Sequence, residues 1–193
     1  MAGKFVDEDA LKDYTRKIWS FKQGEMVSMM IHLGDRLGIY QALDGAGAVS
    51  AADLAEKTGY HSRWLLEWLK NQAAAEILEY HDGERFELTE VGSRVMAEDD
   101  SLQFAAGAFG GPTDPSVIDK LADAFNTGLG LSYEDLGPSS AHGTERMLGP
   151  WTKYGLPKIV PALPGLEDRL SGHAAIADVG CGAGLAIATL AEL

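Results

Sequence analysis

The stretch SAADLAEKTGYHSRWLLEWLKNQAAAEILEYHDGERFELTE, from Ser50 to Glu90, decides the fold of the first half of the chain. It begins with Ser50 and Asp53 three residues apart, which resembles a capping box at the start of a short helix. Gly59 suits the turn that ends this helix, because glycine adopts the backbone conformation of a helix C-cap at little cost.

A second, longer helix is expected to start near His61 or Ser62. Its apolar face is predicted to pack on a core and consists of Leu65, Trp68 and Leu69. Trp64 lies four residues before Trp68 and is therefore expected on the same helix face. We interpret the two tryptophans as core or interface aromatics, with a pair that stacks on a ligand as the alternative.

A β-hairpin is expected after the second helix. Two short alternating apolar runs, at 77–80 and 86–88, are separated by Asp82-Gly83. An Asp-Gly pair between such runs is a strong signal for a hairpin turn. Helix, turn, helix and a two-stranded wing together predict a winged helix.

Many winged helices bind DNA, but the charge of this one argues against it. Contacts with DNA phosphates need cations, because each contact displaces counterions. The wing stretch from Glu79 to Glu90 has five acidic residues against one basic residue, Arg85, hence a net charge of −4. The whole chain has 16 Lys and Arg against 29 Asp and Glu, a net charge of −13. We expect neither nucleic acid nor an anionic membrane surface as a partner.

The composition predicts a globular, cytoplasmic protein. Hydrophobic residues make up 46% of the sequence, yet no apolar run reaches the roughly 18 residues of a membrane span. Cys181 is the sole cysteine, so neither an intramolecular disulfide nor a cysteine-rich zinc site can form. No metal site is expected.

Residues 7–43 carry apolar side chains at three- and four-residue steps, the period of an amphipathic helix. Two helices fit this segment, with Gly24 as the candidate break. The apolar stripe from Met26 to Tyr40 is longer than a small winged helix needs to cover itself. It predicts a homodimer through these helices, with packing on the chain's own core as the alternative.

Residues 99–171 are expected to form a helical connector. Helices are predicted at 116–125 and 144–154, separated by loops rich in glycine and proline. Long loops of this kind often carry ligand contacts.

The chain closes with ADVGCGAG at 177–184, which follows an apolar run and precedes an Ala- and Leu-rich segment. This pattern predicts a strand ending at Asp178, a glycine turn and a helix start. Gly180, Gly182 and Gly184 stand at alternate positions, where the missing side chains would let a ligand lie against the main chain near a helix N-terminus. An ordinary strand-to-helix turn rich in small residues is the alternative.

The glycine stretch resembles motif I of the class I S-adenosylmethionine-dependent methyltransferases, in which an acid and one further residue precede three glycines at alternate positions. With a helical segment and a winged helix before this motif, the chain resembles bacterial methyltransferases of small molecules. The resemblance implies S-adenosylmethionine as the cofactor and a small molecule as the methyl acceptor. The implied cofactor-binding residues are Asp178, Gly180, Gly182 and Gly184.

The resemblance also implies that the connector closes the site, which would bring Trp151, Tyr154 and His142 near the substrate. The acid that binds the ribose and any catalytic base would lie beyond Leu193. The catalytic residues are therefore unassigned, and the chain is expected to be the N-terminal portion of a longer enzyme.

The fold class expected from these features is mainly α with three parts. Residues 1–98 form a helical dimerisation segment and a winged helix, 99–171 the connector, and 172–193 the first strand, turn and helix of a Rossmann-like α/β domain. The alternative is a winged-helix regulator or interaction module without catalytic activity.

Overall fold

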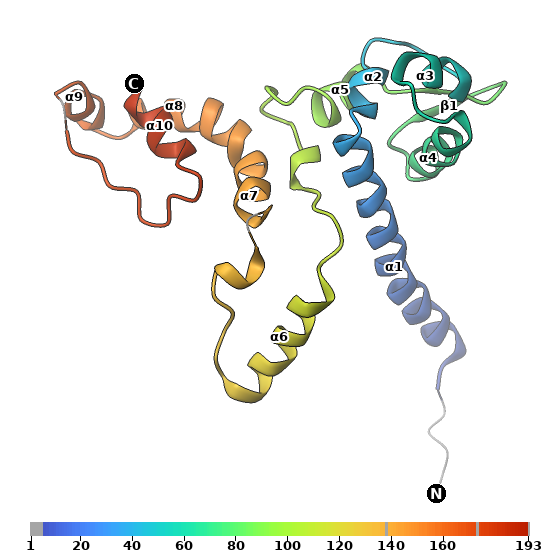
Figure 1. The fold of residues 1–193 in the computed structure, drawn as a ribbon, viewed down its shortest axis with the longest axis horizontal. Helices are drawn as coiled ribbons and strands as arrows, with labels where there is room; N and C mark the ends of the chain where they lie inside the picture. The colour runs from blue at the N-terminus through green and yellow to red at the C-terminus, as the bar shows by residue number, and fades with distance from the viewer. Residues whose placement is uncertain (1–5, 138, 173, 193) are drawn as a thin grey trace, which may run out of the picture.

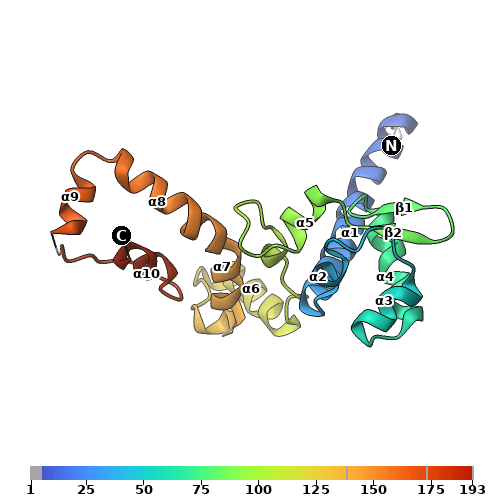
Figure 2. The same cartoon turned by 90° about the horizontal axis from the view of Figure 1, so that it is seen from above.

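The computed structural model of the chain describes residues 6–137, 139–172 and 174–192 (Figure 1). The expected mainly α fold is confirmed, because the sheet within these residues has only two strands. The molecule is elongated. Figure 2 shows the winged helix at one end, the C-terminal helices α9 (Leu166–Ser171) and α10 (Leu185–Ala191) at the other, and the connector between them.

Helix α1 (Glu8–Arg36) is a single helix and projects from the winged helix (Figure 1). Its N-cap is Asp7, whose side chain accepts hydrogen bonds from the backbone N–H groups of two residues in the first turn. The expected break at Gly24 is wrong, since one glycine inside a long helix costs only about 1 kcal/mol relative to alanine. The chain bends instead at Gly38, which has a φ of 67° and precedes α2 (Ile39–Leu43).

The helix-turn-helix is confirmed at the expected positions. Helix α3 (Ala51–Thr58) begins with a capping box between Ser50 and Asp53 and ends at Gly59, which has a φ of 77°. Helix α4 (Ser62–Ala74) follows, with His61 as its N-cap.

The predicted hairpin is also confirmed. Strand β1 (Glu79–His81) pairs antiparallel with β2 (Arg85–Glu87), and Phe86 forms a further bridge to Val49. The loop of residues 82–84 takes positive φ values at Gly83 (80°) and Glu84 (55°). Helix α5 (Glu90–Met96) follows the wing.

The core lies between α2, α3, α4 and the wing. Its fully buried residues include Tyr40, Leu43, Leu54, Leu69 and Phe86. The Tyr40 hydroxyl donates a hydrogen bond of 2.5 Å to Oε1 of Gln72, so both buried polar groups have a partner. Burial, and secondly the charge of Asp35, raises the pKa of Tyr40.

The two tryptophans of α4 differ in their environment. Trp68 is 4% exposed, packs edge-on against Tyr40 and donates its indole N–H to the Met30 carbonyl. Trp64 is 75% exposed, so it is not a core residue of this chain, and an interface role for it stays a prediction. Helix α4 contacts both α1 and α3, and its buried side chains are Leu65, Trp68, Leu69 and Gln72.

The apolar stripe of the first two helices is buried in one part and exposed in another. Ile31, Ile39 and Tyr40 pack in the core of the winged helix, which matches the alternative interpretation of this part of the stripe. The N-terminal half of α1 is different: Leu11, Tyr14, Ile18 and Phe21 are exposed, as is Met26 further along the helix.

Both helices expected in the connector are confirmed. The chain passes through η1 (Ala106–Ala108), α6 (Pro115–Thr127), η2 (Glu134–Leu136) and α7 (Ser139–Pro150). It continues through the π-helical turn η3 (Trp151–Gly155), α8 (Leu156–Ile159) and η4 (Val160–Ala162) to α9. None of the helices in the described residues combines the length and the apolar character that crossing a bilayer requires.

Candidate functional site

The glycine loop lies between a segment without regular secondary structure, 174–178, and helix α10. Gly180, Gly182 and Gly184 have φ values of 82°, 56° and 86°. Residues with a side chain rarely adopt these values, because their Cβ clashes with the backbone. The backbone path of this loop therefore explains why glycine occupies the three alternate positions.

Space around the loop is open. A Cβ atom added at Gly180 or Gly182 would meet no atom within 4 Å. Asp178 is exposed, and its neighbour Val179 is 98% exposed. The described residues do not cover the loop at Gly180 and Gly182, so the main chain there is accessible to a ligand.

The strand expected to end at Asp178 is not formed. Residues 174–178 have no regular secondary structure and pair with no strand of the described residues. A β-strand is defined by hydrogen bonds to a neighbouring strand, and within the described residues the strand ladder lies in the wing. Ile176, the apolar centre of the segment, is consequently 39% exposed.

Helix α10 holds the loop against the connector. It contacts η3 and α8, and the Leu185 side chain lies 3.8 Å from the position of a Cβ on Gly149 of α7. A pocket of about 250 Å³ lies between α9, the 174–178 segment and α10. Its walls are mainly aliphatic, so it offers apolar packing surface rather than polar recognition.

The three connector residues expected near a substrate do not all lie together. Trp151 and Tyr154 belong to the π-helical turn that contacts α10, and Trp151 is 49% exposed. π-Helical turns occur frequently at functional sites. His142 lies instead on α7, with its side chain 80% exposed and 3.6 Å from Glu145.

Two groupings of charged residues were not found from the sequence. Arg146 of α7 pairs with Asp35 of α1, 111 residues away, and no local pattern signals so distant a contact. Glu79, His81 and Glu87 gather on one face of the wing. This second group was detectable, because the hairpin prediction puts two flanking glutamates and the histidine on the same face.

Comparisons with known proteins give one match to a family model and several to solved structures. Residues 25–96 match the model of the Rv2258c-like winged HTH domain. No protein in the curated set matches the sequence.

Three solved structures share the fold at low identity. The mitomycin 7-O-methyltransferase MmcR is 21% identical, with a TM-score of 0.67, over 96% of this chain and 57% of that one. RosA of Streptomyces davawensis, an N,N-8-amino-8-demethyl-D-riboflavin dimethyltransferase, is 18% identical with a TM-score of 0.55, over 92% and 55%. Human N-acetylserotonin methyltransferase, solved with S-adenosylmethionine, is 18% identical with a TM-score of 0.54, over 100% and 58%.

This chain thus spans little more than half the length of the structures that it matches. The resemblance to methyltransferases is confirmed at the level of the fold. Residues 25–96 thus match the Rv2258c-like winged HTH domain, within a chain that shares its fold with part of these methyltransferase structures.

Proposed function

We propose that this chain is the N-terminal portion of an S-adenosylmethionine-dependent methyltransferase that acts on a small-molecule acceptor. The observation that carries the proposal is the glycine loop: three positive φ angles at alternate positions, between Asp178 and the start of α10. The three methyltransferase structures with the same fold support it.

In this proposal the main chain of Gly180, Gly182 and Gly184 lies against the methionine and ribose parts of the cofactor. The open space next to Gly180 and Gly182 accommodates such an approach. Asp178 orients the cofactor, partly through water. Methyl transfer then depends mainly on in-line placement of the acceptor atom and the methyl group. No catalytic base is assigned to this chain.

In this proposal each of the three parts of the chain has its own role. Residues 1–98 form the dimerisation segment and winged helix, 99–171 the connector, and 172–193 the start of the cofactor-binding Rossmann-like domain. The π-helical turn contributes Trp151 and Tyr154 to the acceptor side, since α10 contacts this turn as well as α8.

Nucleic acid is not a partner in this proposal. Every Lys and Arg of α4 and the wing lies beside a carboxylate: Arg63 beside Glu67 at 2.7 Å, Lys70 beside Glu84 at 2.8 Å, and Arg85 beside Asp53 at 3.4 Å. Cations that already face carboxylates gain little from phosphate contacts, because the net charge of the surface stays negative.

A second copy of the chain is the expected protein partner, through the exposed apolar half of α1. A cytoplasmic location fits the single free cysteine.

Calorimetry with S-adenosylmethionine tests the function. The 193-residue chain is expected to bind weakly, because its loop has no neighbouring strands to order it and binding must offset that entropy. A form extended along its reading frame to the length of the matched structures should bind with micromolar or better affinity. In that form Gly182→Val should abolish binding, because a branched side chain both strains the positive φ and fills the cofactor's space.

Gly130→Val is the matched control. Gly130 is also surrounded by open space but has no positive φ, so this variant should bind as the parent does. A reading frame without a further strand ending in an acid about 20 residues after the loop would contradict the proposal. Equal binding by Gly182→Val and the parent would contradict the role of the loop.

A further inference from the structure

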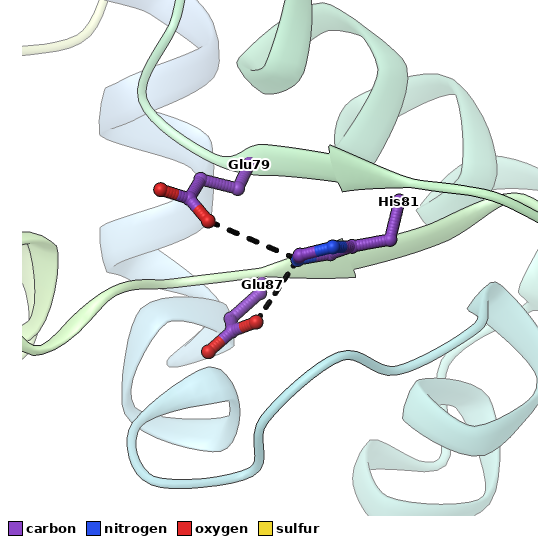
Figure 3. A group of neighbouring side chains, drawn as sticks. All are labelled: Glu79, His81 and Glu87. Carbon is purple, nitrogen blue, oxygen red and sulfur yellow. Dashed lines mark ion pairs between the residues drawn. The ribbon is translucent and has the colours of Figure 1, made fainter.

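The wing carries a compact group of potential metal ligands. Glu79 and Glu87 are directly opposite each other in the β1–β2 ladder, and His81 follows Glu79 by two residues. The three side chains therefore share one face of the hairpin (Figure 3). Tyr80 and Phe86 alternate with them along the strands and pack against each other edge-on. One ligand atom from each of the three residues lies within 4.8 Å of the other two.

The two glutamates repel each other in this register. Like charges directly opposite in an antiparallel pair are destabilising. The nearby cations are engaged elsewhere: Arg85 donates to the Ala48 carbonyl at 2.7 and 3.0 Å, and Lys70 pairs with Glu84. Among the described residues, the basic side chain within 4.0 Å of both glutamates is that of His81, which is charged only when its imidazole is protonated.

The imidazole of His81 points between the two carboxylates. Its Nε2 atom lies 2.9 Å from Oε2 of Glu87 and 3.9 Å from Oε2 of Glu79. This nitrogen is shielded from solvent, yet no hydrogen bond to it is formed among the described residues. A buried ring nitrogen without a hydrogen bond is costly unless another partner satisfies it.

We propose that Glu79, His81 and Glu87 form a Zn²⁺ site on the wing. Zinc binds histidine nitrogen and carboxylate oxygen at about 2.0–2.2 Å, and tetrahedral ligand atoms are then about 3.3 Å apart. The observed nitrogen–oxygen separations of 2.9 and 3.9 Å lie on either side of this value, and all three ligand atoms lie within 4.8 Å of one another, so side-chain rotations can bring them to coordination distance. Water completes the coordination. Because these ligands require no cysteine, the single cysteine of the chain does not exclude such a site.

The ion links the two strands of the wing. Each strand has only three residues, and a short hairpin depends on cross-strand side-chain contacts for its stability. Zinc replaces the repulsion between the glutamates by attraction of both to one cation, and it lowers the negative charge of the wing. An ion that binds only the folded chain also raises the free energy of unfolding.

Calorimetric titration of the untagged 193-residue chain with ZnCl₂ tests the site. We expect saturable binding of one ion, and no comparable binding of Mg²⁺, which does not favour imidazole. His81→Ala and Glu87→Gln should each weaken zinc binding at least about tenfold, since loss of groups that merely orient a ligand already costs about 10- to 100-fold. Zinc should also raise the thermal unfolding midpoint of the parent but not of His81→Ala.

His142→Ala is the matched control, because His142 also lies beside a glutamate, at 3.6 Å, but on α7. This variant should bind zinc as the parent does. His81 is half-exposed, so its replacement should leave the far-ultraviolet circular dichroism unchanged. The proposal is overturned if the parent shows no saturable zinc binding, if His81→Ala binds equally well, or if His142→Ala abolishes binding.

Discussion

The guanidinium of Arg146 holds both carboxylate oxygens of Asp35, with nitrogen–oxygen distances of 2.5 and 3.0 Å. This bidentate pair joins α7 of the connector to α1. The two side chains differ in exposure: Asp35 is 6% exposed and Arg146 is 47% exposed, lying over the Phe104 ring. Removing Arg146 therefore leaves a buried carboxylate without its partner, whereas removing the charge of Asp35 leaves a guanidinium that is still half-exposed.

Arg146→Ala should destabilise the chain more than Asp35→Asn. The first change leaves a carboxylate in a site with little water, which costs about 1–3 kcal/mol. The second leaves a guanidinium that still reaches solvent and still lies over Phe104, so we expect less than about 1 kcal/mol. Urea unfolding of both variants measures the difference.

The double variant separates the pair from other contacts of Arg146. With Asp35 already replaced by Asn, removing Arg146 should cost less than it does in the parent. Equal costs in both backgrounds would show that the pair contributes nothing to holding α7 on α1.

Two glycines in α1 should respond in opposite directions to alanine. At Gly24 no atom lies within 4 Å of an added Cβ, so Gly24→Ala should stabilise by about 0.5–1 kcal/mol through helix propensity. At Gly34 the Cβ would lie 2.3 Å from Cζ2 of Trp68 and 3.0 Å from Cε2 of Tyr40. Gly34→Ala should therefore destabilise by about 1–3 kcal/mol. Thermal unfolding of the two variants, side by side, tests both signs.

Sequence patterns predicted the winged helix accurately because its signals are local. The capping box at Ser50, the left-handed Gly59 and the Asp82-Gly83 turn each act within a few residues. Sequence patterns gave wrong predictions where burial or strand pairing depends on a second element that is distant in sequence. Trp64 has the spacing of a core residue but is 75% exposed, and the 174–178 segment has strand composition but pairs with no strand of the described residues.

The candidate site was predictable only in part. The alternate glycines marked the loop, and their positive φ angles agree with that interpretation. Arg146 and Asp35 come together through the packing of helices distant in sequence, which no periodicity encodes. The wing group differs, because the predicted hairpin was enough to find it: the charges of Glu79 and Glu87 alone indicate no site, but their register places them opposite each other.

Asp135 should titrate at unusually low pH. It accepts hydrogen bonds from Lys120 at 2.6 Å and from the Ser132 hydroxyl and N–H at 2.7 and 2.8 Å. The Lys120 ammonium above all, and then Ser132, lowers the pKa of Asp135 to about 2. The contact between α6 and η2 is thus fully stabilising above the ordinary aspartate range, near pH 4, and weakens as the pH falls through about 2.

Carbon NMR of the Asp135 carboxyl group during acid titration measures this midpoint directly. Lys120→Met removes the largest cause and should move the midpoint toward that of an ordinary aspartate. A parent midpoint near the ordinary value of 3.8 would show that the pair does not persist in solution.

The exposed half of α1 should mediate self-association. Leu11, Tyr14, Ile18 and Phe21 follow one another at steps of three, four and three residues and are 48–65% exposed, a continuous apolar stripe on a helix that projects from the molecule (Figure 1). Ile18→Glu places a charge at its centre and should weaken the dimer at least about tenfold, since an interface would have to bury that carboxylate. Gln23→Glu adds the same charge on the opposite side of α1 and should leave the dimer intact. Light scattering across a concentration series distinguishes the two. A parent chain that stays monomeric at high concentration, or equal weakening by both variants, would exclude this stripe as the interface.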